Sequence, residues 1–287
     1  MSAAPADPAA PADPATPADL GPSGAQPSDA ESSVHPFLRV ERAGEVQTVT
    51  LTNPAKRNAQ TPSLWRALAQ VAASTPAHIR VVVLRGEGQS FSAGLDRQML
   101  LPGGVAGEPD MMSVAAASTG AMEELIEDFQ GGFTAWAQLP AVVVAAVQGH
   151  AIGAGFQLAL AADLRVVADD VQLAMRETAL GMVPDLGGTG PLVHLVGYSR
   201  ALEICATGRF VGAQEAVAIG LASAAVPADQ LEAATADLVA ALVATPREAL
   251  RALKPLLRKA GDAPVADQLA EERRVNAGLI AALAEGR

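Results

Sequence analysis

Short apolar runs alternate with helical patterns along this chain. Residues 81–86 and 142–147 are mostly apolar, and a third such run covers 164–168. Runs of this length that end at glycine or polar residues are typical of strands buried on both faces of a parallel sheet. Residues 37–40 and 46–51 are also strand-like, and Gly44 between them predicts a hairpin. The pattern favours an α/β fold with a parallel-type sheet.

Helical periodicity fills the segments between these strands. Thr61 precedes Pro62 and is expected to cap a helix over 62–74. A long helix is predicted over 115–139, and a helix of small residues over 153–163. The C-terminal part is mostly helical, with helices predicted at 199–207, 214–219, 228–244, 246–259 and 266–283. Pro255 is expected to kink or split the helix that contains it.

Residues 1–34 differ in composition from the rest of the chain. The tripeptide Pro-Ala-Asp recurs at Pro5, Pro11 and Pro17, and the segment holds five acidic residues and no Lys or Arg. Such a segment cannot bury enough apolar surface to offset the entropy lost on ordering. We therefore expect a disordered tail that is a solvated extension, with a partner-binding tail as the alternative.

Composition narrows the class of protein. The formal charge of −11 argues against nucleic-acid binding, and the single cysteine, Cys205, excludes an internal disulfide and suits a reducing compartment. No apolar run approaches the roughly 20 residues that a membrane span needs, and the N-terminus lacks the pattern of a signal peptide. The four histidines are scattered without metal-ligand spacing. We expect a cytoplasmic protein without a metal site and without membrane or nucleic-acid partners.

Two glycine-containing turns carry the candidate chemistry. Residues 91–96 read Phe-Ser-Ala-Gly-Leu-Asp, and residues 149–158 read Gly-His-Ala-Ile-Gly-Ala-Gly-Phe-Gln-Leu. Each follows a predicted buried strand and precedes a helical pattern, so the two turns can aim backbone N–H groups at one point. Two converging N–H groups form an oxyanion hole, which stabilises negative charge on a carbonyl oxygen. The alternative is a pair of ordinary strand-to-helix turns. A dinucleotide fingerprint is excluded, because Leu158 stands where its third glycine belongs.

Two carboxylates follow in the segment 176–189, which contains further glycines. They belong to Glu177 and Asp185. A polarised carbonyl beside a carboxylate base predicts proton abstraction next to a thioester. The structural alternatives are an ion pair between Glu177 and Arg176, and a turn role for Asp185 after Pro184.

These three segments, in this order and spacing, resemble the crotonase (enoyl-CoA hydratase/isomerase) superfamily. The likeness extends from about Arg39 to the C-terminus and includes the segments 53–59, 208–210, 213–216 and 220–222. It implies a crotonase-like α/β spiral of ββα units over 35–225, followed by a helical trimerisation region over 226–287. It further implies a homotrimer or a dimer of trimers. The substrate would be an acyl-CoA, with coenzyme A as part of that substrate and no tightly bound cofactor.

The resemblance also implies roles for the candidate residues. Leu95 and Ala154 match the two oxyanion N–H donors, although the family commonly has glycine in place of Ala154. Hydratases of the family use two glutamates, and Gln157 and Glu177 occupy those two positions. A neutral amide can hold a water or a substrate group, but it cannot act as a general base. Asp185 matches an aspartate that dienoyl-CoA isomerases use as a second base.

We therefore expect an enoyl-CoA isomerase or an enoyl-CoA hydratase, with Glu177 as the acid/base. Isomerisation is favoured, because one carboxylate is enough to move a proton between two carbons, whereas hydration also requires a deprotonated water. The alternatives are a catalytically silent acyl-CoA-binding member, and a family thioesterase or decarboxylase.

The phosphates of coenzyme A require a local basic group on this acidic protein. Lys56, Arg57 and Arg97 are the candidates, with solvated surface charge as the alternative. Asn58 is expected to hold its loop through side-chain-to-backbone bonds, and Asp96 to cap a following helix. The coenzyme A contacts implied by the resemblance are Lys56, Arg57, Asn58, Ala93, Gly94, Asp96, Arg97, Gly153 and Gln157.

Overall fold

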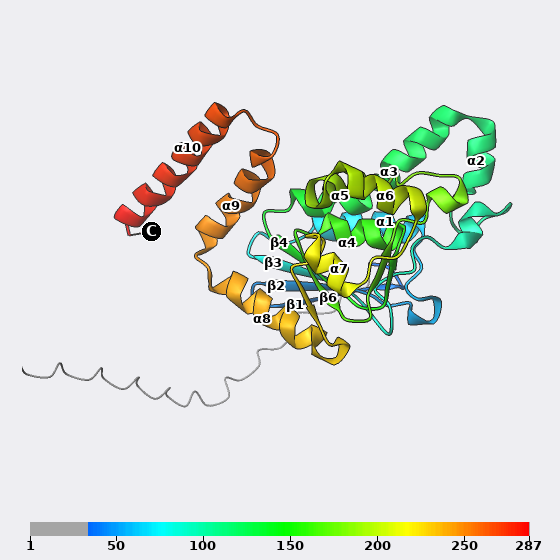
Figure 1. The fold of residues 1–287 in the computed structure, drawn as a ribbon, viewed down its shortest axis with the longest axis horizontal. Coiled ribbons are helices and arrows are strands. Elements are labelled where there is room, and N and C mark those ends of the chain that lie inside the picture. Colours follow the sequence, from blue (N-terminus) through cyan, green and yellow to red (C-terminus); the bar gives the residue numbers. More distant parts are fainter. Residues whose placement is uncertain (1–33, 287) are drawn as a thin grey trace, which may run out of the picture.

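A six-stranded sheet forms the centre of the molecule in the computed structural model, which describes residues 34–286 (Figure 1). The predicted disordered segment 1–34 lies outside the described residues, apart from Val34. The strand order is β1-β2-β3-β4-β6-β8. A hairpin joins β1 to β2 antiparallel, and all the other neighbours are parallel. The strands are β1 (Leu38–Ala43), β2 (Val46–Leu51), β3 (Val81–Gly86), β4 (Val142–Val147), β6 (Leu164–Ala168) and β8 (Ala224–Val226).

Both faces of this sheet are covered, as the unbroken apolar runs predict. Alternate residues point to opposite faces, so Val82 and Leu84 of β3 pack with the helices α1, α3 and α4. Val81 and Val83 face the other way and pack with Leu231 and Val239 of α8. The predicted parallel α/β architecture is therefore confirmed, and the strands predicted at 81–86, 142–147 and 164–168 are all present.

The helices on the first face differ from prediction in two details. The long helix predicted over 115–139 is two helices, because Ser118 is extended and its hydroxyl caps the second by accepting from Ala121 N–H. Thr61 does take the N-cap position of α1, but its side chain makes no capping bond. Gly132 lets α3 approach α1, since a Cβ there would lie 2.5 Å from Trp65 O. These helices are α1 (Pro62–Ala73), α2 (Met111–Ala117), α3 (Thr119–Gln138) and α4 (Ala154–Ala161).

Three short strands escape sequence prediction. Two of them, β5 (His150–Ile152) and β7 (Gln172–Ala174), pair in parallel as a separate two-stranded sheet. The third is β8, at the edge of the main sheet. Each has three residues, which is too short for a period of two to stand out from its surroundings. The small sheet places the two candidate segments side by side, because the second glycine turn follows β5 and Glu177 follows β7.

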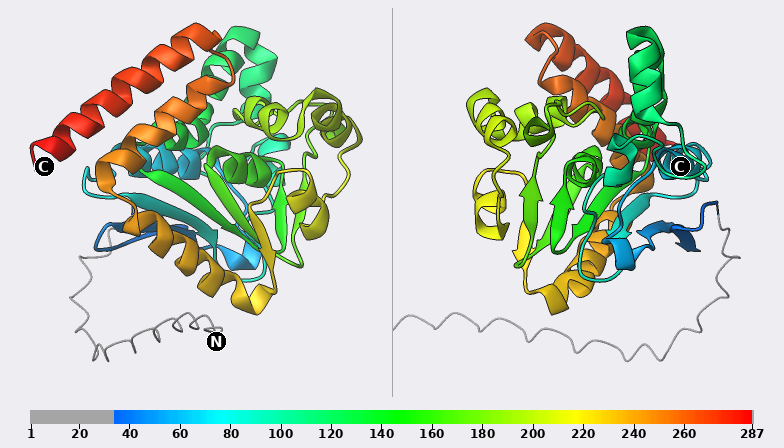
Figure 2. Two further views of the ribbon diagram at one scale, coloured as in Figure 1. Left: turned by 60° about the vertical axis from the view of Figure 1, so that its left-hand side comes forward. Right: turned by 90° about the vertical axis from the view of Figure 1, so that its right-hand side faces the viewer.

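The chain from Gly190 onward is mostly helical, as predicted, and its last two helices stand to one side of the sheet (Figures 1 and 2). Pro255 does not split α9; it is exposed, so water can reach the carbonyl that loses its helical partner. Among residues 34–286, no helix combines the length and apolarity of a membrane span. The helices are α5 (Thr189–Val196), α6 (Tyr198–Thr207), α7 (Ala213–Ala218), α8 (Leu231–Ala244), α9 (Arg247–Ala260) and α10 (Val265–Ala284).

Candidate active site

The two glycine turns lie against each other. Ser92 N–H donates to His150 O (2.9 Å), and Ile152 N–H donates to Ser92 O (3.0 Å), so the first turn runs parallel to β5. Gly94 has a φ of +89°, and a Cβ there would lie 2.4 Å from Ile152 O and 3.5 Å from Ala154 N. Only glycine permits this approach, which brings the first turn within van der Waals distance of the start of α4.

The N–H groups of Leu95 and Ala154 lie in the two turns that contact each other. Gln60 N–H donates to Gly94 O and Asp96 N–H donates to Gln60 O, both at 2.8 Å. In a trans peptide the N–H points opposite to the carbonyl, so Leu95 N–H points away from Gln60. Ala154 is the first residue of α4, where N–H groups have no partner within the helix and the helix dipole is positive. These positions suit the predicted oxyanion hole.

A buried chain of polar groups holds the first turn. Trp65 Nε1 donates to Gln60 Oε1 (2.7 Å), and Gln60 Nε2 donates to Ser92 Oγ (2.9 Å). Ser92 Oγ donates to Asn58 O (2.7 Å) and accepts from Gly94 N–H (3.2 Å). Sequence reasoning missed Gln60, because a single glutamine has no motif. The available signal was Trp65, whose buried N–H requires an acceptor.

Glu177 lies directly beside the second turn. A Cβ on Gly153 would be 3.1 Å from Glu177 Oε1, so the carboxyl group packs against this glycine, next to Ala154. The side chain is buried, and among the described residues its Oε2 atom has no hydrogen-bond partner. Burial raises the pKa of Glu177, and the charge of Asp185 raises it further. A buried, unpartnered carboxylate oxygen with a raised pKa suits proton transfer.

The side-chain amide of Gln157 is hydrogen-bonded through both its oxygen and its nitrogen. Its Oε1 accepts from Leu186 N–H (2.9 Å) and Gly188 N–H (3.2 Å). These two donors orient the amide, so Nε2 faces Glu177 and donates to its Oε1 (2.8 Å). The amide therefore fastens Glu177 to the 186–188 loop, and its oxygen is not free to hold a water. The expectation that Gln157 holds a water or a substrate group stays a prediction, because these bonds use only one of the two Nε2 hydrogens.

Asp185 lies close enough to Glu177 to repel its charge. Its carbonyl oxygen accepts from Gln130 Nε2 (2.7 Å), which ties this loop to α3. Burial is the main cause of the raised pKa of the Asp185 carboxyl group. The charge of Asp185 therefore acts on the other predicted carboxylate, Glu177. Within residues 34–286, no group of three or more His, Cys, Asp and Glu side chains is arranged to hold a metal ion.

The basic candidates lie on the adjoining loops. Ala93 N–H donates to Arg57 O (2.8 Å), which joins the 53–58 loop to the first turn. Lys56 Nζ pairs with Asp96 Oδ2 (2.9 Å), and Asp96 also caps the short 3₁₀ helix Arg97–Leu100, as predicted. Arg97 is exposed at the start of that helix.

Asn58 and Arg57 are neighbours in the 53–58 loop, but their side chains have different surroundings. Asn58 holds the loop as expected, donating to Glu87 O and Ser90 O and accepting from Asn53 N–H. Arg57 lines a separate cavity of about 800 Å³ between the sheet and α8, and Glu177 does not line it.

Comparison with known proteins identifies the family. Residues 41–286 match the enoyl-CoA hydratase/isomerase family. The chain is 32% identical over 243 residues to the 2,3-dehydroadipyl-CoA hydratase of Escherichia coli K12, covering 83% of this chain and 88% of that one.

Solved structures extend the comparison to bound ligands. The structure of a Thermobifida fusca YX protein in complex with acetoacetyl-CoA superposes with a TM-score of 0.82 at 45% identity, covering 85% of this chain and 95% of that one. The same organism supplies a CoA complex with a TM-score of 0.82 at 44% identity, covering 87% and 95%. An enoyl-CoA hydratase from Bacillus anthracis superposes with a TM-score of 0.74 at 27% identity, covering 88% and 97%. The fold is thus that of the crotonases, and the chain belongs to the enoyl-CoA hydratase/isomerase family.

Proposed function

We propose that this protein moves a proton at the carbon next to the thioester carbonyl of an enoyl-CoA, with Glu177 as the acid/base. The observation that carries the proposal is the buried, unpartnered Oε2 of Glu177 beside the two oxyanion turns. The thioester oxygen accepts from Leu95 N–H and Ala154 N–H. The acyl chain then lies between this pair of donors and the carboxylate.

The geometry suits isomerisation of a 3-enoyl-CoA to a 2-enoyl-CoA. Glu177 Oε2 takes a proton from C2, and the C–H electrons move into the carbonyl, which becomes the oxygen anion of a dienolate. The two N–H groups stabilise that anion, and each such donor contributes roughly 3–4 kcal/mol. The protonated Glu177 then returns the proton at C4, and the electrons of the dienolate form the C2–C3 double bond.

Gln157 favours this one-base reaction. Its amide holds Glu177 Oε1, so Oε2 is left to reach the substrate. Coenzyme A recognition is supported by the two Thermobifida fusca complexes, one with acetoacetyl-CoA and one with CoA. We assign the phosphate contacts to Lys56 and Arg97, and the contacts along the thioester arm to the turns that contain Ala93, Gly94 and Gly153.

Hydration of a 2-enoyl-CoA is the second candidate. Two observations favour it: the hydratase names of the relatives and the second carboxylate, Asp185, whose charge acts on Glu177. The experiment offers a 3-enoyl-CoA and a 2-enoyl-CoA separately and identifies the products by chromatography, which separates the two isomers, and by mass, which detects water addition. Conversion of the first to its 2-enoyl isomer supports isomerisation, and water addition to the second supports hydration. Release of free CoA would contradict both.

Replacing Gln157 with glutamate tests the role of its amide. The new carboxylate still accepts from Leu186 and Gly188, but it places an oxygen instead of a donor against Glu177 Oε1. Two carboxylates at this distance share a proton, which raises the pKa of Glu177. We expect 3-enoyl-CoA turnover at pH 7 to fall about tenfold. The loss should diminish as the pH is raised. Turnover equal to wild type at pH 7 would contradict the assigned role of Gln157.

The C-terminal helices support a homotrimer, which is part of the same proposal. Large apolar side chains of α9 and α10 are exposed, among them Leu257 at 62% and Leu283 at 75%. Contiguous exposed apolar surface is typical of an interface. We expect a trimer in size-exclusion chromatography with light scattering. Leu257→Asp should shift it towards monomer, whereas Leu202→Asp, at an exposed apolar position on α6, should leave it a trimer. A monomeric wild-type chain would contradict the proposal.

A further inference from the structure

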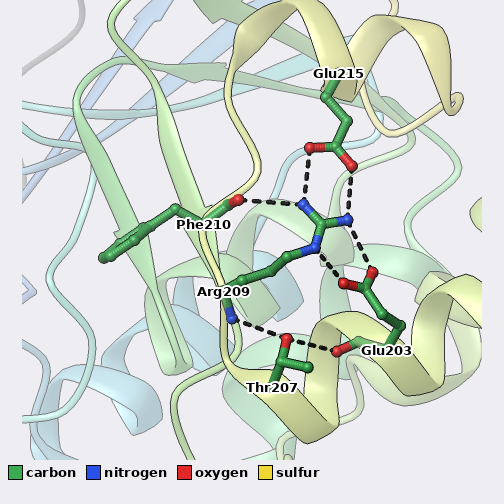
Figure 3. Close-up of polar contacts among 5 residues, drawn as sticks. All are labelled: Glu203, Thr207, Arg209, Phe210 and Glu215. Carbon is green, nitrogen blue, oxygen red and sulfur yellow. Dashed lines mark hydrogen bonds and ion pairs between the residues drawn. The ribbon is translucent and has the colours of Figure 1, made fainter.

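Arg209, in the turn between α6 and α7, is held by a carboxylate from each helix (Figure 3). Its Nε and Nη2 donate to the two oxygens of Glu203, on α6. Its Nη1 and Nη2 donate to the two oxygens of Glu215, on α7, at 2.8 and 2.7 Å. The remaining Nη1 donor reaches Phe210 O at 3.3 Å. All five donors of the guanidinium group are therefore used, in two bidentate pairs that fix the turn relative to both helices.

The turn that Arg209 holds is fastened to the chain on both sides of Glu177. Leu173 and Val211 exchange backbone hydrogen bonds of 3.0 and 2.8 Å, which attaches β7 to the end of the turn. Arg176 Nη1 donates to Gly208 O (2.9 Å), and its guanidinium lies 5.9 Å from the centre of the Phe210 ring. These contacts fix the backbone immediately before Glu177.

The residue that follows Glu177 is also bound to this region. Thr178 Oγ1 donates to Cys205 O (2.7 Å), in the last turn of α6. Close packing adds to these bonds, because a Cβ on Gly208 would lie 3.1 Å from Met175 O.

Glu177 depends on this support for its position. The Glu177 side chain has one side-chain hydrogen bond, from Gln157, and its other oxygen has no partner among the described residues. Its direction is therefore set largely by the backbone of residues 176–178, which the turn holds. Loss of Arg209 would also leave Glu203 and Glu215 to repel each other across the turn. The pairs themselves are partly exposed, and exposed ion pairs contribute little to overall stability.

We propose that Arg209 is a positioning residue, which holds the turn at 208–211 and through it the catalytic carboxylate of Glu177. The inference rests on the proposed function of Glu177. It adds a residue to the machinery that neither touches the substrate nor lies in the two oxyanion turns.

The test compares Arg209→Met with wild type, using enzyme normalised to the concentration of CoA-ester binding sites. We expect kcat to fall about 10- to 100-fold, the range that a displacement of roughly 1 Å produces. KM should change by less than about threefold, because the substrate contacts remain. The acid limb of the pH profile should move to lower pH, since a displaced Glu177 becomes hydrated. Arg209→Lys keeps the charge without the bidentate geometry and should recover only part of kcat.

Arg66→Met is the matched control. Arg66 is likewise a partly exposed arginine paired with a carboxylate, Asp128, but it joins α1 to α3. Its kcat and pH profile should equal those of wild type. If Arg209→Met fails to fold, the double variant Glu203→Gln with Glu215→Gln weakens the same pairs without creating repulsion. It should lower kcat in the same direction.

Different results would overturn the proposed function and the role of Arg209. Wild-type protein that neither converts an enoyl-CoA nor exchanges its C2 proton would overturn the proposed function. Active wild type together with wild-type kcat and pH profile in Arg209→Met, or in the double variant, would overturn the role of Arg209 alone.

Discussion

Replacing Glu177 with glutamine is expected to lower enoyl-CoA turnover by about 10²- to 10⁴-fold, the usual contribution of a general acid/base. Glutamine has nearly the same shape and keeps the hydrogen bond from Gln157 Nε2, so binding of a CoA ester should be largely unchanged. The measurements are steady-state turnover and calorimetric affinity for a non-reactive CoA ester. Glu232→Gln makes the same chemical change at a side chain that is 89% exposed, and it should have wild-type turnover.

The raised pKa of Glu177 predicts two pH effects, one on turnover and one on stability. Burial raises the pKa of Glu177, so wild-type turnover should fall on the acid side at a pH above the ordinary pKa of a glutamate. For stability, the raised pKa means that the folded state retains the proton more tightly than the unfolded state. The stabilisation from protonated Glu177 is complete below its unfolded pKa and is lost as pH rises through the folded one.

Glu177→Gln should therefore have a higher Tm than wild type at pH 8, and the difference should vanish in acid. Full turnover in Glu177→Gln would contradict the assignment of the acid/base. If the two proteins had equal Tm values at every pH, burial of ionised Glu177 would not destabilise the fold.

Gly94→Ala is expected to lower kcat by about 10²- to 10³-fold, as for loss of one oxyanion donor. The new methyl group would lie 2.4 Å from Ile152 O, a contact that forces the two turns apart. A φ of +89° adds backbone strain, because residues with a Cβ rarely adopt it. The separation moves Leu95 N–H away from Ala154 N–H, so the thioester oxygen loses one of its two donors.

Gly103→Ala distinguishes the effect of backbone strain from the effect of forcing the two turns apart. Gly103 has a similar φ of +85°, but a Cβ there would meet nothing within 4 Å. It therefore carries the same backbone strain in a loop without the contact between turns, and it should retain wild-type kcat. Equal losses in the two variants would show that strain, rather than the spacing of the turns, causes the effect in Gly94→Ala.

The sheet and the two turns were predictable because their determinants are local. Apolar runs such as 142–147 identify strands buried on both faces, and glycine at 94 identifies a turn that must approach another chain segment closely. The break at Ser118 was missed, since the apolar periodicity continues across it and only the serine cap marks the new helix.

The function of Gln157 was only partly predictable. The resemblance to the family implies that Gln157 stands where a hydratase has a glutamate. The oxygen of Gln157 accepts hydrogen bonds from Leu186 and Gly188, which lie 29 and 31 residues further along the chain. These bonds form only because the loop at 186–188 folds back onto Gln157. The pairing of Arg209 with Glu203 and Glu215 depends likewise on how two helices are placed. Contacts of this kind have no pattern in a single sequence.

Solvent-deuterium exchange at C2 of a bound enoyl-CoA tests the central claim most directly. The substrate is incubated in D₂O with wild type and with Glu177→Gln, and deuterium at C2 and C4 is followed by NMR. The account predicts incorporation with wild type and none above background with Glu177→Gln. Tight CoA-ester binding with neither exchange nor conversion of a 3-enoyl-CoA in wild type, or equal exchange in both proteins, would contradict it.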